Sequence, residues 1–110
     1  MITPEFSNGL NPSLVGNMEG GVNVGLKSLH IGCNQMMTQI QFLGQSVVDR
    51  FPTHAEMYNQ NINSQAMNAA NLARDQLDVL EHFLAACAIT GVQAVELRSK
   101  EVAGTFDARA

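Results

Sequence analysis

The sequence of 110 residues has little charge, because Asp, Glu, Lys and Arg make up only 15% of it, and it has no tryptophan. An ordinary soluble domain carries about a quarter charged residues, so this chain has too few to coat a small globule by itself. Lys and Arg number six and the net charge is −4, which argues against a surface that binds nucleic acid. Two cysteines give no disulfide framework and suit a reducing compartment.

Long apolar runs are also missing. A helix that spans a membrane needs about 18 or more consecutive apolar residues, and the longest candidate, residues 83–97, is interrupted by polar residues and a glycine. Residues 1–7 lack the basic start and apolar stretch of a secretory signal. We therefore expect a cytoplasmic protein that binds no membrane and whose surface is covered by other protein.

Turn-forming residues fill the start of the chain, and two apolar stripes follow. Pro, Gly and Asn in residues 1–21 predict an irregular loop. A helix is expected over 22–50, because apolar residues there recur at alternating steps of four and three until Pro52 ends the pattern. The members of this first stripe are Val22, Leu26, Leu29, Cys33, Met36, Ile40, Leu43 and Val47.

A polar connector rich in Asn and Gln, residues 52–63, leads to a second helix expected over 64–100, with Ser64 as its N-cap. Its stripe comprises Ala66, Ala70, Ala73, Leu77, Leu80, Leu84, Cys87, Gly91 and Ala94. Over residues 83–95 the polar face thins out, so we expect this helix to be buried on nearly all sides. Helices of about 40 and 50 Å are too long to bury each other's apolar surface. The predicted fold class is all-α: two long helices from a larger helical bundle, within a single segment of one domain.

Few residues suggest chemistry by themselves. His30 and Cys33 lie three apart and could place two metal ligands on one helix face, but two ligands are not a site and we expect no metal. Both cysteines are more simply small buried hydrophobes. Lys27 lies off the main stripe with Ile31 one turn along, so the pair could form the wall of a pocket, although a lysine that faces solvent is the simpler alternative. Glu56 precedes a dense set of amides, for which a lined active site competes with an exposed connector.

Six stretches, in uninterrupted order along the chain, carry a family pattern. They are FSNGL at 6–10, VNVGLK at 22–27, RFPTHAE at 50–56, NQNINS at 59–64, ANLAR at 70–74 and VQAVELR at 92–98. Together they resemble the aromatic amino acid ammonia-lyases, within the histidine ammonia-lyase superfamily, and above all the bacterial phenylalanine and tyrosine enzymes.

The resemblance implies an all-α homotetrameric enzyme of about five times this length, of which the chain is a stretch from the second half. Such enzymes eliminate ammonia from phenylalanine or tyrosine to give cinnamate or coumarate. Their cofactor is an electrophilic 4-methylidene-imidazol-5-one (MIO) formed from an Ala-Ser-Gly triplet, which does not occur in these 110 residues. The expected partners are the aromatic amino acid, the rest of the enzyme and the other subunits, and the isolated segment should be inactive.

Carried over residue by residue, the resemblance assigns Lys27 and Ile31 to the pocket around the substrate's side chain. It assigns Glu56, Asn59 and Gln60 to the polar cluster near the prosthetic group and the substrate amine, with Glu56 as the catalytic residue. A carboxylate there can hold the ammonium against the electrophile. Histidine-specific relatives typically have Met in place of Lys27 and Glu in place of Gln60, which favours a phenylalanine or tyrosine enzyme. The alternatives are an MIO-dependent 2,3-aminomutase, a histidine ammonia-lyase relative or, in another class, a noncatalytic helical oligomerisation module.

Overall fold

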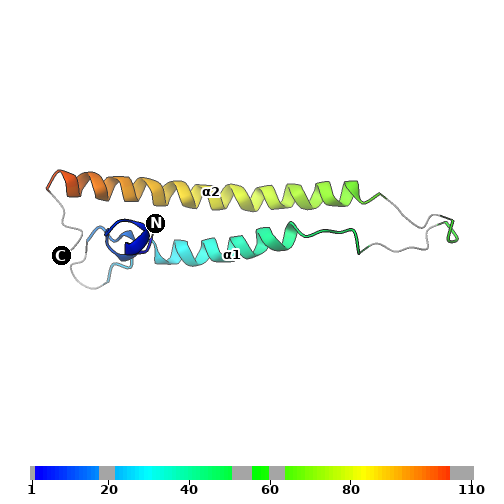
Figure 1. Cartoon of the computed structure of the whole chain (residues 1–110), viewed down its shortest axis with the longest axis horizontal. Coiled ribbons are helices and arrows are strands. Elements are labelled where there is room, and N and C mark those ends of the chain that lie inside the picture. Colours follow the sequence, from blue (N-terminus) through cyan, green and yellow to red (C-terminus); the bar gives the residue numbers. More distant parts are fainter. Residues whose placement is uncertain (1, 18–21, 51–55, 60–63, 105–110) are drawn as a thin grey trace.

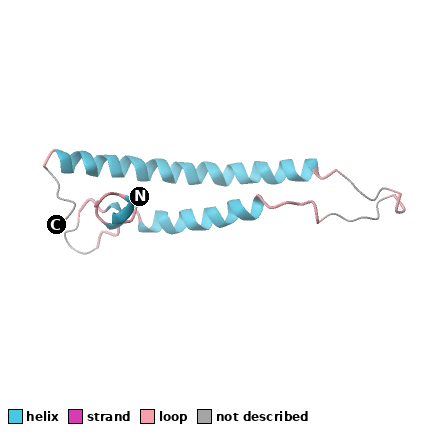
Figure 2. Cartoon of the chain, in the orientation of Figure 1, coloured by secondary structure: helices cyan, strands magenta, loops and turns pink. Residues whose placement is uncertain are grey.

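Two long helices lie side by side and account for most of the molecule (Figure 1). The structure is a computed structural model, and it describes residues 2–17, 22–50, 56–59 and 64–104. The long helices are α1 Lys27–Leu43 and α2 Ala66–Val102, and two single-turn 3-10 helices, η1 Pro4–Phe6 and η2 Pro12–Leu14, precede them. No strand occurs among the described residues (Figure 2), and the all-α prediction is confirmed.

The molecule is a rod rather than a globule. Its principal extents are 75 × 23 × 20 Å and its radius of gyration is 22.1 Å. A compact chain of this length would have a radius of gyration of about 13 Å. The elongation leaves both helices with faces that no other part of the described chain covers.

The first helix begins five residues later than the apolar stripe predicted. Gly25 has φ +56°, a left-handed conformation that interrupts a right-handed helix, and the Leu26 N–H donates to Ser13 O at 2.8 Å. Lys27 is therefore the first helical residue. The helix also ends at Leu43 rather than near residue 50, so its length is about 25 Å instead of the expected 40 Å.

The second helix agrees more closely with its predicted range of 64–100. Its 37 residues run from Ala66 to Val102, and the Ala66 N–H donates to Ser64 Oγ at 3.3 Å. Ser64 thus satisfies the first N–H of the helix, although Gln65 occupies the N-cap position. By length and composition alone, α2 is long and apolar enough to cross a membrane, although polar residues interrupt its apolar run. A helix surrounded by other helices of a bundle would have the same composition.

The two helices pack against each other. The contact face of α1 is the predicted apolar stripe, whereas the contact face of α2 differs from its predicted stripe. On α1 the predicted residues from Leu29 to Leu43 are partly buried, and so is Gly32 beside Cys33. On α2 the buried face is displaced by one residue, so that Leu77 and Leu84 are 57% and 56% exposed while Gln76 and Thr90 turn inward. The Gln76 side chain donates to the carbonyl oxygen of Ile40, near the end of α1, at 2.9 Å. This polar contact helps to fix which face of α2 meets α1.

The most buried cluster lies where the N-terminal loop folds over the second half of α2. Leu10 and Leu14 from the loop pack with Leu97, and the partly buried Leu26 and Ala94 complete the cluster. Loop chemistry predicted an irregular segment here, but the segment also supplies much of the core. Because Leu26 belongs to the same cluster, the core also contacts the start of α1.

Several apolar residues in the second half of α2 are exposed to solvent. Ile89, Val92 and Val95 are each more than half exposed, although this region is expected to be buried on nearly all sides. One neighbouring helix and a loop cannot enclose a helix that is apolar around its circumference. Such a contiguous apolar surface is typical of an interface with further protein.

Candidate functional site

Lys27 and Ile31 lie together at the beginning of α1. Lys27 is its first residue, and Ile31 follows one turn later on the same side of the helix. Lys27 is exposed and Ile31 is 62% exposed. An ammonium group beside an aliphatic side chain is thus presented outward, as one open wall rather than as an enclosed pocket.

Glu56 and Asn59 are brought together by a tight turn. Glu56, Met57 and Tyr58 all have positive φ, at 53°, 55° and 70°, and the Asn59 N–H donates to Glu56 O at 3.0 Å. The Asn59 side-chain amide also donates to Glu56 Oε2 at 3.4 Å. Glu56 and Asn59 are both exposed. Gln60, the third predicted member of this polar cluster, lies outside the described residues.

The Lys27–Ile31 pair and the Glu56–Asn59 turn are far apart in space within one copy of the chain. Lys27 opens α1, whereas the green segment 56–59 lies beyond the opposite end of α1 (Figure 1). The helix alone separates them by about 25 Å. One copy of the described chain therefore does not bring Lys27 and Glu56 into a common site.

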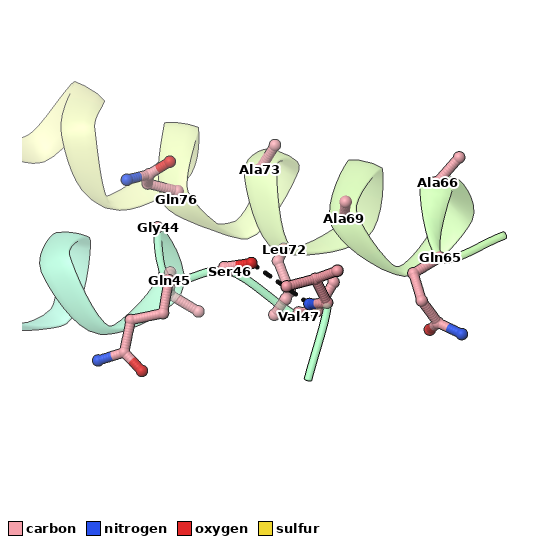
Figure 3. A pocket seen from close by; sticks show the side chains of 12 residues that line it. Gly44, Gln45, Ser46, Val47, Gln65, Ala66, Ala69, Leu72, Ala73 and Gln76 are labelled. Atoms are coloured by element: carbon pink, nitrogen blue, oxygen red, sulfur yellow. Dashed lines mark hydrogen bonds between the residues drawn. The ribbon is translucent and has the colours of Figure 1, made fainter. Parts of the chain in front are cut away.

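An apolar groove lies between the end of α1 and the start of α2 (Figure 3). It has a volume of about 630 Å³, and its lining includes Leu43, Val47, Ala69 and Leu72. Ser46 Oγ, on the same wall, accepts a hydrogen bond from the Val48 N–H at 3.3 Å. None of the described site residues lines this groove, so it offers apolar surface rather than chemistry.

A second hollow of about 440 Å³ lies between the helices, with His30, Cys33 and Cys87 among its lining residues. Burial, and then the nearby Cys87, raise the pKa of the Cys33 thiol, so Cys33 stays protonated at neutral pH. Cys87 is exposed, and the expectation that it is buried was wrong for the described chain. No group of three or more His, Cys, Asp or Glu side chains in the described part of the chain could hold a metal ion.

The contacts of Arg98 and Gln93 were not anticipated. Arg98 Nη2 donates to the carbonyl oxygens of Ser7 and Asn8 at 2.8 and 2.9 Å, and Gln93 Nε2 donates to Leu14 O at 3.2 Å. Both residues belong to the VQAVELR motif, which carried part of the family resemblance but assigned neither of them a role. The structure shows that this motif holds the N-terminal loop.

Comparison with known proteins places these observations in a family. All 110 residues match the family model described as aromatic amino acid lyase. The chain is 80% identical over 109 residues to an aromatic ammonia-lyase of Loktanella atrilutea and 52% identical over 109 residues to a phenylalanine ammonia-lyase of Nostoc punctiforme. Each alignment covers 99% of this chain but only 20% and 19% of the respective relatives, so the chain spans about a fifth of their length. A phenylalanine aminomutase of Taxus chinensis is 35% identical over 98 residues, which are 89% of this chain and 14% of that protein.

Proposed function

Because this chain belongs to the aromatic amino acid lyase family, we propose that it forms part of an enzyme that eliminates ammonia from phenylalanine or tyrosine and releases the arylacrylate. The observation that supports this most strongly is the 80% identity to an aromatic ammonia-lyase over nearly the whole chain. The aminomutase relative is much less similar, at 35%, which favours the release of ammonia over its re-addition to the product.

Within this proposal, Glu56 holds the substrate amine. Its carboxylate is exposed and accepts from the Asn59 amide at 3.4 Å, so Asn59 orients it while part of its acceptor capacity remains for an ammonium group. This donor set suits the polar side of a site with the MIO group, which would form from residues outside these 110 and would supply the electrophile. Gln60 extends the same polar set in sequence. Lys27 and Ile31 form the wall around the aromatic side chain.

The separation of Lys27 from Glu56 supports a site shared between subunits. A substrate that contacts both groups needs Lys27 and Ile31 from one copy and Glu56 and Asn59 from another, because Lys27 begins α1 and the turn with Glu56 lies beyond its other end. Antiparallel packing of two copies of the rod would bring unlike ends together. The separation therefore requires at least two subunits at each active site, and we propose that they belong to the homotetramer that the family resemblance implies.

The first test uses the complete enzyme that contains this segment. With phenylalanine or tyrosine as substrate, the arylacrylate absorbance should rise, and Glu56→Gln should lower kcat by about 10²- to 10⁴-fold, because the amide cannot accept a proton from the amine. Glu81→Gln, at an exposed position of α2, is the matched control and should retain activity. Near-native turnover by Glu56→Gln would remove Glu56 from the mechanism. A β-amino acid product would identify an aminomutase, and the absence of any product would favour the noncatalytic oligomerisation module.

The second test mixes subunits. Co-assembly of Lys27→Ala subunits with Glu56→Gln subunits should restore activity at about a quarter of the sites, because random mixing leaves that fraction with both native residues. If Lys27 and Glu56 served the same site from one subunit, every site would carry one substitution and the mixed enzyme would stay as inactive as its parents. The two homotetrameric variants provide the baseline.

A further inference from the structure

Side chains in the last turns of α2 donate hydrogen bonds to the N-terminal loop, and the proposed reaction does not use these side chains. Arg98 Nη2 donates to two consecutive carbonyl oxygens, those of Ser7 at 2.8 Å and Asn8 at 2.9 Å. Its Nη1 pairs with Glu101, which fixes the plane of the guanidinium group. Gln93, further back on the helix, donates to Leu14 O at 3.2 Å. The loop is therefore held on α2 at two points.

The same loop is tied to the first residues before α1. Ser13 O accepts the Leu26 N–H at 2.8 Å, and a Cβ atom on Gly25 would lie only 2.4 Å from Ser13 O. The approach is so close that only glycine fits, and Gly25 also has φ +56°. Lys27 is two residues further on and begins the helix. A shift of the loop must therefore shift the turn that places Lys27.

We propose that Arg98, assisted by Gln93, is a positioning residue for the Lys27 wall of the substrate pocket. Arg98 sets the loop on α2, the loop sets the Gly25–Leu26 turn through Ser13, and this turn sets where α1 and Lys27 begin. Arginine suits this task because its planar group can donate to two carbonyls and to a carboxylate at once, which a lysine does with poorer geometry. The inference rests on the proposed function, since it assigns Lys27 to the substrate's side chain.

The test measures kcat and KM of the complete enzyme for phenylalanine and tyrosine, per folded tetramer. Arg98→Met should raise KM by about tenfold or more and change the phenylalanine-to-tyrosine ratio of kcat/KM, because a small displacement of a pocket wall alters substrate fit. Arg98→Lys should recover part of both values. Arg74→Met is the matched control, since Arg74 lies on the same helix but pairs with Asp75 rather than with the loop, and it should change neither value.

A double-mutant cycle separates positioning from a merely structural role. If Arg98 acts through Lys27, Arg98→Met should raise KM much less in a Lys27→Met background than in the native one. Additive effects, or fewer folded tetramers with unchanged KM and substrate ratio, would overturn the inference. If Arg98→Met does not fold, Arg98→Lys and Gln93→Leu replace it, and native KM values in both would overturn it equally. An inactive native enzyme would instead refute the proposed function.

Discussion

Replacement of Leu97 by alanine should detach the N-terminal loop from α2. Leu97 is 1% exposed and packs with Leu10 and Leu14. The substitution removes three buried carbon atoms, which contribute about 2.4 kcal/mol at about 0.8 kcal/mol each. The cavity that remains adds to this loss, and the total for such a substitution is usually about 2–5 kcal/mol. The cluster lies at one end of the rod, where the loop can partly collapse into the space. We therefore expect a loss of about 3 kcal/mol.

Amide hydrogen exchange of the 110-residue chain would measure this loss where it occurs. The Leu26 N–H is donated to Ser13 O and the Leu14 N–H to Asn11 O, so both amides report on the folded loop. A loss of about 3 kcal/mol in local stability should make them exchange about a hundredfold faster. Amides in the middle of α1 should change much less, because their hydrogen bonds do not depend on the loop.

Leu77→Ala is the matched control for Leu97→Ala. Leu77 lies on the same helix but is 57% exposed, so its loss should cost less than about 1 kcal/mol in the isolated chain. Equal effects of the two substitutions, or native exchange at Leu26 in Leu97→Ala, would refute the account of where the core lies. In the complete enzyme Leu77→Ala should cost more than in the isolated chain, because a neighbouring helix would cover this position.

Three further predictions address single contacts. Gly25→Ala should destabilise the start of α1 by about 2 kcal/mol or more, since its Cβ would meet Ser13 O at 2.4 Å and φ is +56°. The control is Gly9→Ala, where nothing lies within 4 Å of the new Cβ, and it should show only the smaller effect of its positive φ. Thermal unfolding measures both variants. The raised pKa of Cys33 predicts slower alkylation by iodoacetamide than at the exposed Cys87 near pH 8, read by mass spectrometry. Because burial disfavours the thiolate, Cys33 leaves the free energy of unfolding unchanged below the unfolded thiol pKa and lowers it as pH rises through the folded one. Gln76→Leu removes the donor to Ile40 O and should cost about 1 kcal/mol, seen as faster exchange at the Gly44 N–H; native exchange there would contradict this role.

The periodicity of apolar residues predicted the contact face of α1 well, because helical spacing is a local property. It did not predict where α1 starts. Val22 continues the apolar pattern but is 86% exposed, since the Ser13–Leu26 hydrogen bond and the backbone of Gly25 prevent the helix from extending back to it. Such a contact joins residues that are distant in sequence, and a repeat of three and four carries no information about it.

For the candidate site, too, the sequence identified residues but not their arrangement in space. The resemblance indicated Lys27 and Glu56 as site residues, but it gave no distance between them; in the structure Lys27 begins α1 and Glu56 lies beyond its other end. The resemblance likewise included Arg98 in a motif without a role. Its hydrogen bonds to Ser7 and Asn8 connect residues about 90 positions apart, and only the folded chain could reveal them.

The low charge of the sequence can be related to the faces of α2. One face contacts α1, and apolar residues on other faces stay exposed in this chain. The face that contacts α1 includes Gln76 and Thr90, whereas Leu77 and Leu84 of the more regular apolar stripe stay more than half exposed. If the pairing with α1 were the main source of burial, the most apolar stripe would lie between the two helices. Its outward position indicates that α2 is adapted to other neighbours at least as much as to α1. In the proposed homotetramer, those neighbours would cover the open stripe and would also bring the Glu56 turn of one subunit to the Lys27 wall of another.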